Sequence, residues 1–333
     1  MIGVPTRLRR GPLIALAVLL VAVLGVVTWV LVSDGDSEDA APRPAPPPGE
    51  SGQPGPEFAV PPQPPVPVTV VKIDNVEAAR PQTGLAAADV VYVEPVEGGF
   101  TRLAAVYSSQ LPEVSGPVRS AREADVELLA QYGRPSLVFS GAAPEIEPVL
   151  AGSSATLVRQ RDVPDGFFRE PGRPAPHNLY ARLPLLPRGE GPGPGQVLPR
   201  GDPPSGGRDV TDHVVDVGRD EYRFTFSPGS GRWLVALEGT PVTSVGAGDV
   251  GAATVVVQRV EETAGTAVED ASGSPSPVVR TVGTGQATVL RDGKLYAGTW
   301  SRPSPTEGTR FTTASGEALP LADGPVWVLL VPR

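Results

Sequence analysis

The sequence predicts an α+β protein, in which a mixed α/β domain precedes a β-rich domain and one transmembrane helix lies at the N-terminus. Three observations lead to this prediction. An uncharged apolar run lies near the N-terminus, strand-like and helix-like patterns alternate in the middle of the chain, and short strand-like runs separated by turns follow. The 39 glycines and 41 prolines among 333 residues favour turns and strands over long helices.

The apolar run covers residues 12–32 (PLIALAVLLVAVLGVVTWVLV), and the preceding residues 1–11 contain Arg7, Arg9 and Arg10. About 20 apolar residues in a helix cross a hydrocarbon core of about 30 Å. Because positively charged flanks stay in the cytoplasm, we expect a single-pass protein of the cell membrane with a cytoplasmic N-terminus and extracytoplasmic domains. A cleaved signal peptide is the alternative, although its apolar core usually has only about 7–15 residues.

The remaining chain divides by composition into a linker, two domains and a loop. Residues 33–67 are rich in proline, glycine, serine and acidic residues, which predicts a disordered, extended linker. Residues 68–186 contain strand-like runs such as VTVVKI beside the helix-like run READVELLAQY, and this mixture predicts the mixed α/β N-terminal domain. Residues 187–208 read as a Gly/Pro-rich loop, and residues 209–333 as the β-rich C-terminal domain.

The composition excludes several classes of protein and site. A formal net charge of −9 disfavours binding to nucleic-acid phosphates. The absence of cysteine excludes disulfides, a thiolate nucleophile, cysteine-ligated zinc and a lipid-modified cysteine. The two histidines, His177 and His213, have no metal-ligand spacing, and the sequence has no phosphate-binding loop, dinucleotide motif or nucleophile elbow. We therefore expect neither a metal nor a cofactor.

Polar residues gather in four segments of the predicted N-terminal domain, residues 72–85, 93–102, 116–122 and 176–180. These segments lie beside predicted strand ends and turns, so they hold the candidates for chemistry. The candidate catalytic residues are Glu94, Glu97 and His177, and the candidate ligand-binding residues are Asp74, Asn75, Arg80, Arg102, Arg119, Arg122 and Tyr180.

The acidic candidates also have structural interpretations. Asp74 and Asn75 follow a buried strand and can cap a turn, because such side chains bind nearby backbone amides. Glu94 and Glu97 can work as an acid and a base if their surroundings separate their pKa values. Alternatively, they pair with nearby arginines in an ion network, in which buried arginine is tolerated.

The basic candidates leave similar alternatives open. Arg119 and Arg122 lie three residues apart near a predicted helix start, where they can form a fork for a carboxylate or phosphate ligand, or simply lie in solvent. His177, in the loop segment PHNLY, can act as a general base or a ligand-contacting donor. It can equally be a hydrogen-bonded structural histidine.

Several of these motifs occur together in one order: IDN, ARPQTGL, VEGGFTR, GPVRSAR and PHNLY, followed by ATVVVQRV, GTGQATVLRDGKLYAGTW and PVWVLLVP. In this respect the sequence resembles the YerB-like lipoprotein family, known as domain of unknown function family 3048, over about residues 68–333. The resemblance implies an extracytoplasmic location and a two-domain layout, and it implies no established activity. Many members have a lipobox cysteine, which this chain lacks, so we expect the apolar helix to be its anchor.

We expect an extracytoplasmic cell-envelope protein of uncharacterised activity that binds a ligand or partner in the cell-wall space. The alternative is a hydrolase or transferase that acts on cell-wall material through the Glu/Asp/His/Arg residues of the N-terminal domain. A structural spacer is a third possibility. The expected partners are the membrane and either a cell-wall glycan or an envelope protein, but no nucleic acid. The sequence does not determine the oligomeric state.

Overall fold

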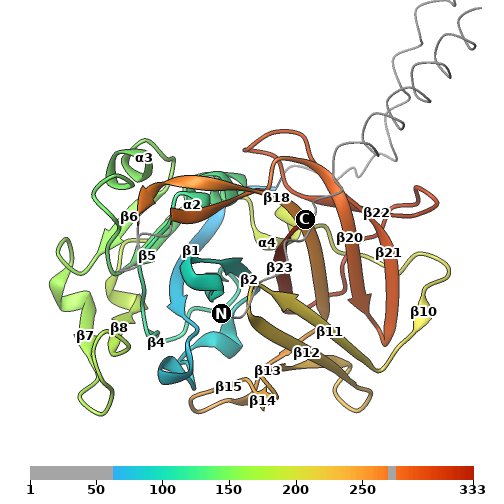
Figure 1. The fold of residues 1–333 in the computed structure, drawn as a ribbon, viewed down its shortest axis with the longest axis horizontal. Coiled ribbons are helices and arrows are strands. Elements are labelled where there is room, and N and C mark those ends of the chain that lie inside the picture. The colour runs from blue at the N-terminus through green and yellow to red at the C-terminus, as the bar shows by residue number, and fades with distance from the viewer. Residues whose placement is uncertain (1–62, 269–274) are drawn as a thin grey trace, which may run out of the picture. The chain divides into compact units, whose positions relative to one another are not determined.

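A computed structural model describes residues 63–268 and 275–333, and β-strands form most of this part of the chain (Figure 1). The predicted transmembrane helix, residues 12–32, lies outside the described residues, as does the predicted linker up to residue 62. Within the described ranges, no helix has the length and apolar character needed to cross a membrane.

The main sheet of the described residues has 13 strands, drawn from both halves of the chain. Its strands are β1 (Val66–Asp74), β2 (Val90–Pro95), β3 (Thr101–Tyr107), β5 (Ser136–Phe139), β6 (Thr156–Arg159), β9 (Gly189–Gly191), β10 (Arg208–Asp209), β18 (Thr254–Val268), β19 (Pro275–Arg280), β20 (Gly283–Arg291), β21 (Lys294–Arg302), β22 (Arg310–Thr313) and β23 (Val326–Pro332). Their order is β10-β21-β20-β18-β23-β2-β3-β1-β5-β6, and β19, β22 and β9 pair with β18, β21 and β1.

Several strands of this sheet run in the same direction, among them β1, β2, β5, β6, β18 and β23. β2 pairs in parallel with β23, and β23 pairs in parallel with β18. β1 and β2 are both antiparallel to β3, so β1 also runs in this direction. The carboxyl ends of β1, β2, β23 and β18 therefore lie along one margin of the sheet, the place where open α/β sheets bind ligands.

The two faces of the sheet contact different layers, because successive side chains of a strand point to opposite faces. Val70 of β1 is buried in one cluster with Leu128 of helix α2 (Ala124–Leu129). Val71 and Ile73 are buried in another cluster with Trp233. The alternating pattern of β1 thus fixes which of its residues face α2 and which face the second sheet.

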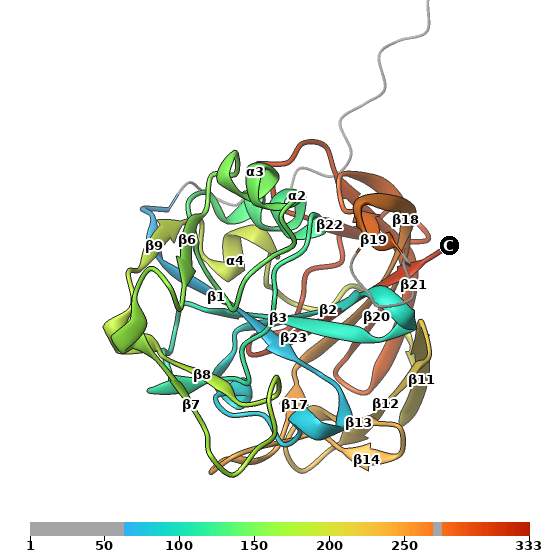
Figure 2. The same ribbon diagram turned by 60° about the vertical axis from the view of Figure 1, so that its left-hand side comes forward.

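The second sheet packs on the face opposite α2. In Figures 1 and 2, β12 and β13 lie below the main sheet, whereas α2 and α3 lie above it. The indole of Trp327 in β23 packs edge-on against Tyr222 and Phe224, with ring centroids 6.3 and 6.4 Å apart. The strands of the second sheet are β11 (Asp212–Val217), β12 (Asp220–Ser227), β13 (Arg232–Leu237), β14 (Thr240–Pro241) and β17 (Gly251–Ala252).

Two small sheets and several short helices complete the described structure. The small sheets are formed by β15 (Thr243–Ser244) with β16 (Gly248–Asp249), and by β4 (Val114–Ser115), β8 (Leu179–Arg182) and β7 (Phe167–Arg169). The other α-helices are α3 (Glu147–Ala151) and α4 (Pro194–Val197). The 3₁₀ turns are Glu77–Ala79, Leu85–Ala87, Glu97–Gly99, Ala130–Tyr132, Pro164–Gly166 and Leu183–Leu185.

The prediction of an α+β fold with a transmembrane helix is contradicted by this architecture, which is mostly β in the described residues. The three α-helices found there have six, five and four residues. The helix-like run READVELLAQY supplies only α2 and one 3₁₀ turn, because Gly133, at a φ of +71°, ends the segment. The boundaries between an N-terminal domain (68–186), a loop (187–208) and a C-terminal domain (209–333) stay a prediction.

Candidate functional site

The polar candidates gather where β1 and β2 end and β3 begins. In the register of the sheet, Asp74 lies opposite Arg102, and Arg102 lies opposite Glu94. Residues directly opposite one another share a face, and residues two apart in one strand do so as well. Lys72 therefore joins this row, on the face that is covered by α2.

Lys72 and Glu94 form a buried ion pair. Lys72 Nζ lies 2.7 Å from Glu94 Oε2 and 2.7 Å from Asp125 Oδ1 of α2, and all three side chains are inaccessible or nearly so. Burial, reinforced by the charge of Asp125 and opposed by Lys72, raises the pKa of Glu94 to about 7. The other carboxylate oxygen, Glu94 Oε1, is buried without a hydrogen-bond partner in the described structure.

Glu97 and Arg122 form a two-pronged ion pair, and the backbone N–H of Arg122 donates to Asp125 Oδ2. Arg122 Nε donates to Glu97 Oε1 over 2.7 Å, and Arg122 Nη2 donates to Glu97 Oε2 over 2.9 Å. Burial alone would raise the pKa of Glu97, but the hydrogen bonds and charge of Arg122 outweigh it and hold this pKa below its usual value. Glu94 and Glu97 thus have separate basic partners, and their roles as an acid and a base stay a prediction.

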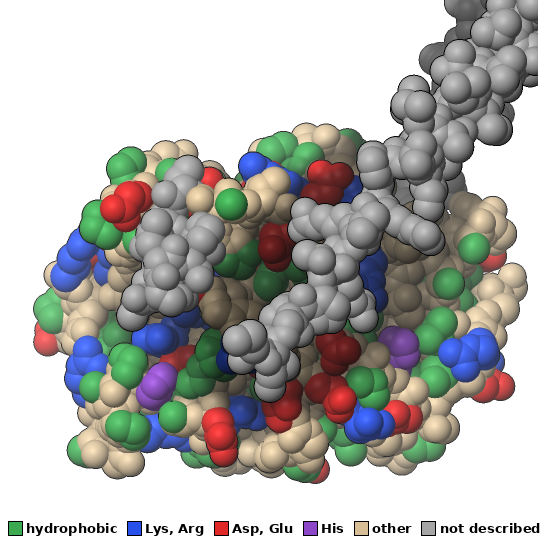
Figure 3. Space-filling model, viewed as in Figure 1, with side chains coloured by type: hydrophobic (Ala, Val, Ile, Leu, Met, Phe, Trp, Pro, Cys, Tyr) green, Lys and Arg blue, Asp and Glu red, His purple; other side chains and the backbone are tan. Residues whose placement is uncertain are grey.

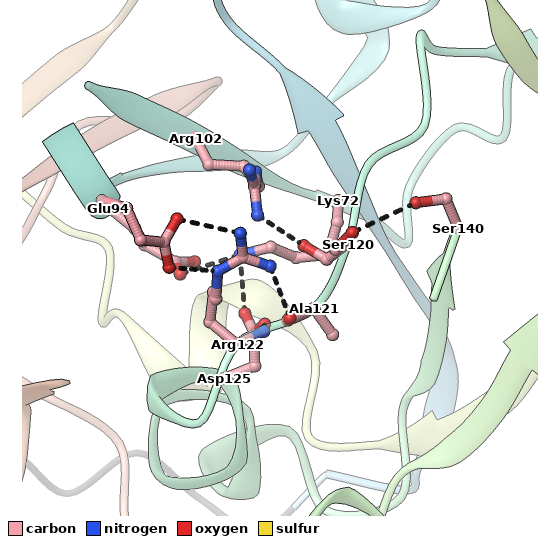
Figure 4. A network of polar contacts seen from close by, with 9 residues as sticks. Lys72, Glu94, Arg102, Ser120, Ala121, Arg122, Asp125 and Ser140 are labelled. Atoms are coloured by element: carbon pink, nitrogen blue, oxygen red, sulfur yellow. Dashed lines mark hydrogen bonds and ion pairs between the residues drawn. The ribbon is translucent and has the colours of Figure 1, made fainter. Parts of the chain in front are cut away.

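Arg102 is the cation of this cluster whose charge is least balanced by nearby carboxylates. Its Nη1 donates to the backbone oxygen of Ser120 over 3.0 Å, and its side chain lies beside the guanidinium of Arg122 (Figure 4). Within residues 63–268 and 275–333, no carboxylate forms an ion pair with Arg102, although the residue is only 6% exposed. Burial, followed by the charges of Arg122 and Arg119, lowers the pKa of Arg102 to about 10.

Asp74, Arg119 and His177 form the more accessible part of the cluster. Asp74 Oδ2 lies 2.7 Å from His177 Nδ1 and 3.1 Å from Arg119 Nε. The side chain of Asp74 is 3% exposed, whereas those of Arg119 and His177 are 26% and 20% exposed. The Nε–H of Arg119 does not point at the carboxylate well enough for a hydrogen bond. The partly exposed side chains of Arg119 and His177 therefore connect the buried charges to solvent.

Asn75 belongs to a different network on the other face of the sheet. Its Nδ2 donates to Thr101 Oγ1 over 2.7 Å and to Tyr222 OH over 2.6 Å, and Gln82 Nε2 donates to Asn75 Oδ1 over 3.1 Å. Thr101 Oγ1 in turn donates to Asp220 Oδ2 over 2.6 Å. This network joins β1 and β3 to β12, so the structure gives Asn75 a role in joining distant segments.

Arg80 and Tyr180 lie away from the charged row. Arg80 lines a cavity of about 610 Å³ together with Glu77 and Glu238. Tyr180 stacks on Phe168, with ring centroids 5.6 Å apart. Their described contacts therefore give no support to a shared site with Asp74 and Arg119.

Lys72 and Asp125 are the participants that the sequence-based candidates omitted. Lys72 is a fully buried lysine in a valine-rich strand, and such a lysine requires anionic partners. The alternation of Val68, Val70, Lys72 and Asp74 was the available signal, because it places Lys72 on the face of Asp74. Asp125 had no comparable signal, since it is brought to Lys72 by the packing of α2.

Two cavities of the described structure lie at opposite ends of these strands. One of about 1010 Å³ is lined by residues at the amino ends of β1, β2 and β23 and includes none of the predicted site residues. A cavity of about 500 Å³ at the carboxyl ends of β2 and β23 includes Glu97. Figure 3 shows acidic and basic side chains interspersed over one face of the molecule, without a large patch of either sign. Among the described residues, no group of histidine and acidic side chains could hold a metal ion.

Comparisons with known proteins agree with the motifs of the sequence. Residues 56–190 match the N-terminal domain of the family described as protein of unknown function (DUF3048), and residues 213–328 match its C-terminal domain. A stretch of 116 residues is 42% identical to the Bacillus subtilis protein named "Putative lipoprotein YerB", and it covers 34% of each chain. The crystal structure of the YerB protein from Bacillus subtilis superposes with a TM-score of 0.67 at 21% identity, over 81% of this chain and 92% of that one.

The order of the two matched segments is the order in which the motifs occur along the chain, and together they include all ten predicted site residues. The structural similarity independently supports a shared fold. The chain therefore belongs to the DUF3048 family and carries both of its domains, the N-terminal one first.

Proposed function

We propose that this protein is an extracytoplasmic, membrane-associated protein of the cell envelope that binds an anionic group of its ligand, a carboxylate or a phosphate, beside Arg102 and Arg119. The observation that carries the proposal is that, among the described residues, no carboxylate forms an ion pair with the buried guanidinium of Arg102. Asp74 is engaged by Arg119 and His177, and Glu97 by Arg122, which leaves Arg102 without a carboxylate partner of its own.

A buried cation is costly when its charge is not compensated. An oxyanion beside Arg102 would supply this compensation and raise the pKa of Arg102, which burial, followed by the charges of Arg122 and Arg119, lowers. A guanidinium binds both oxygens of a carboxylate or phosphate at once, and water is largely excluded here, which strengthens such hydrogen bonds. Arg119 and His177, both partly exposed, are placed to guide the ligand from solvent to Arg102.

The proposed location has two supports. The B. subtilis relative is named "Putative lipoprotein YerB", and lipoproteins are attached to membranes by their lipid chains. In this chain, an apolar run at residues 12–32 follows three arginines, as in exported or membrane-attached proteins. A cell-wall glycan or an envelope protein remains our proposed source of the anionic group.

The Asp74–His177 pair supports hydrolysis or transfer as a second candidate function. A carboxylate at Nδ1 orients an imidazole, so that Nε2 is available as a general base. Incubation of the full-length protein with purified cell-wall material tests this candidate. Product release that disappears in His177→Ala would support it, and no release from the unaltered protein would contradict it.

Calorimetric titration of the full-length protein with inorganic phosphate and with acetate tests the binding proposal. Loss of one charge-assisted hydrogen bond corresponds to about 1.5–3 kcal/mol, so we expect Arg119→Gln and Arg102→Lys each to weaken binding about tenfold or more. Arg161→Gln is the matched control, because Arg161 is 62% exposed and pairs with Glu147 elsewhere on the surface. Equal dissociation constants for all of these proteins would contradict the proposal.

A further inference from the structure

A second cavity lies beyond Glu97, at the carboxyl ends of β2 and β23 and beside the middle of β18, and has a volume of about 500 Å³. Pro95, Val96 and Val331 supply apolar lining from two of these strand ends. This volume falls within the range of about 300–1,000 Å³ that is usual for small-ligand sites. The cavity is therefore large enough for a compact ligand with an apolar portion.

Close backbone contact between distant segments forms one wall of the cavity. Gly98, Gly99 and Gly218 line it, and Arg219 N donates to Gly99 O over 2.8 Å. A Cβ on Gly218, whose φ is +63°, would lie only 2.3 Å from Gly99 O. This contact explains Gly218 and holds the turn Glu97–Gly99 against the β11–β12 turn, whereas Gly98 and Gly99 of the motif VEGGFTR have positive φ values of +69° and +76° that favour glycine.

Charged residues of both signs are among those that line the same cavity. Arg259 and Glu262 belong to β18, Asp216 to β11, and all three are exposed. Within residues 63–268 and 275–333, none of the three forms an ion pair or a side-chain hydrogen bond. Glu97, in contrast, is held by Arg122. The cavity thus offers one unpaired guanidinium and two unpaired carboxylates around an apolar floor.

We propose that this cavity binds a short peptide that has a free ammonium group and a free carboxylate group. Arg259 receives the carboxylate, since a guanidinium matches its two oxygens. Glu262 and Asp216 receive the ammonium group, and an aliphatic side chain of the peptide packs on Val96, Pro95 and Val331. The site is distinct from the anion site at Arg102, and it does not depend on the proposed function.

Calorimetric titration of the full-length protein with alanyl-alanine tests the proposal. We expect saturable binding that weakens at least tenfold when the dipeptide is N-acetylated and at least tenfold when it is C-terminally amidated. Arg259→Gln should weaken binding of alanyl-alanine at least tenfold and should make amidation of the dipeptide nearly without effect. Glu262→Gln should also weaken binding of alanyl-alanine at least tenfold, and it should make N-acetylation of the dipeptide nearly without effect.

Arg208→Gln is the matched control, because Arg208 is also an exposed arginine on a strand but lies outside the cavity. This variant should bind alanyl-alanine as the unaltered protein does. Three results would overturn the proposal. They are the absence of binding to alanyl-alanine, equal binding by the blocked dipeptides, and tighter binding of phosphocholine, which would identify a zwitterionic headgroup instead of a peptide. Unchanged far-UV circular dichroism of each variant separates loss of binding from loss of folding.

Discussion

Lys72 Nζ lies 2.7 Å from Glu94 Oε2 on a buried face of the main sheet, where the two side chains are 0% and 2% exposed. The pair joins β1 to β2 although β3 lies between these strands. Asp125 of α2 binds the same ammonium group. The ion pair therefore also holds α2 on the sheet, and most of the charged row depends on this arrangement.

Lys72→Met should destabilise the protein strongly, because it leaves Glu94 and Asp125 buried without their shared cation. Removal of one partner of a buried ion pair costs about 3–5 kcal/mol in the free energy of unfolding. Urea denaturation at neutral pH measures this loss. Lys294→Met is the control and should change the midpoint little, because Lys294 pairs with Asp209 on the surface. A midpoint for Lys72→Met like that of the control would contradict the assignment.

Glu94→Gln should change how stability depends on pH. Glu94 has a pKa of about 7 in the folded protein, above its ordinary value of 4.5. The stability that it contributes is therefore present below pH 4.5 and is lost as the pH rises to about 7. Relative to the unaltered protein, Glu94→Gln should gain up to roughly 3 kcal/mol in unfolding free energy between pH 5 and pH 8.

Urea denaturation across this pH range tests the prediction for Glu94. Glu145→Gln serves as the control, because Glu145 is exposed and lies outside the buried charged row. If the difference for Glu94→Gln follows that for Glu145→Gln across this pH range, the raised pKa of Glu94 is wrong.

Tyr222→Phe should lower stability by about 1–2 kcal/mol, because it leaves buried polar groups of Asn75 and Thr101 without their shared partner. Thermal unfolding measures the effect. Tyr296→Phe is the comparison, since Tyr296 is also buried, at 4% exposure, but lies outside this network. Equal effects of the two substitutions would show that the hydrogen bonds of Tyr222 with Asn75 and Thr101 contribute nothing specific to stability.

Gly218→Ala should destabilise the protein more than Gly246→Ala. Both glycines have a positive φ, +63° and +77°, so both substitutions carry a similar conformational cost of about 1 kcal/mol. Only at Gly218 does the new methyl group meet backbone, at 2.3 Å from Gly99 O, whereas nothing lies within 4 Å at Gly246. Chemical denaturation should show an extra loss of about 1–3 kcal/mol for Gly218→Ala. An equal loss of stability in both variants would mean that the β11–β12 turn can move away from Gly99 without cost.

Much of the local structure could be predicted from the sequence. The valine-rich runs are strands, and the polar candidates Asp74, Glu94 and Arg102 lie at strand ends, as their positions beside these runs indicated. The amount of helix was overestimated. Apolar residues at helical spacing also occur in short turns, and only tertiary packing determines how many turns of helix persist.

The sequence predicted which residues could belong to the candidate site, but not which of their side chains pair with each other. Glu94 and Glu97 were considered as a pair, but Lys72 and Arg122 separate them by engaging each one. Asp74 and Asn75 were considered together, but neighbouring residues of a strand point to opposite faces, so they enter different networks. Ion pairs depend on atoms within about 4 Å, and sequence spacing alone does not fix such distances across strands.

The sequence by itself determined which apolar runs form strands, which residues could carry charge beside them, and the motifs of the DUF3048 family. It did so because side-chain alternation and turn residues act locally. Only the tertiary structure decided that the last strand, β23, lies between β2 and β18, and that Tyr222 meets Asn75 across 147 residues of chain. Such pairings depend on the packing of the whole sheet, in which each long-range contact is stable only because many others form with it.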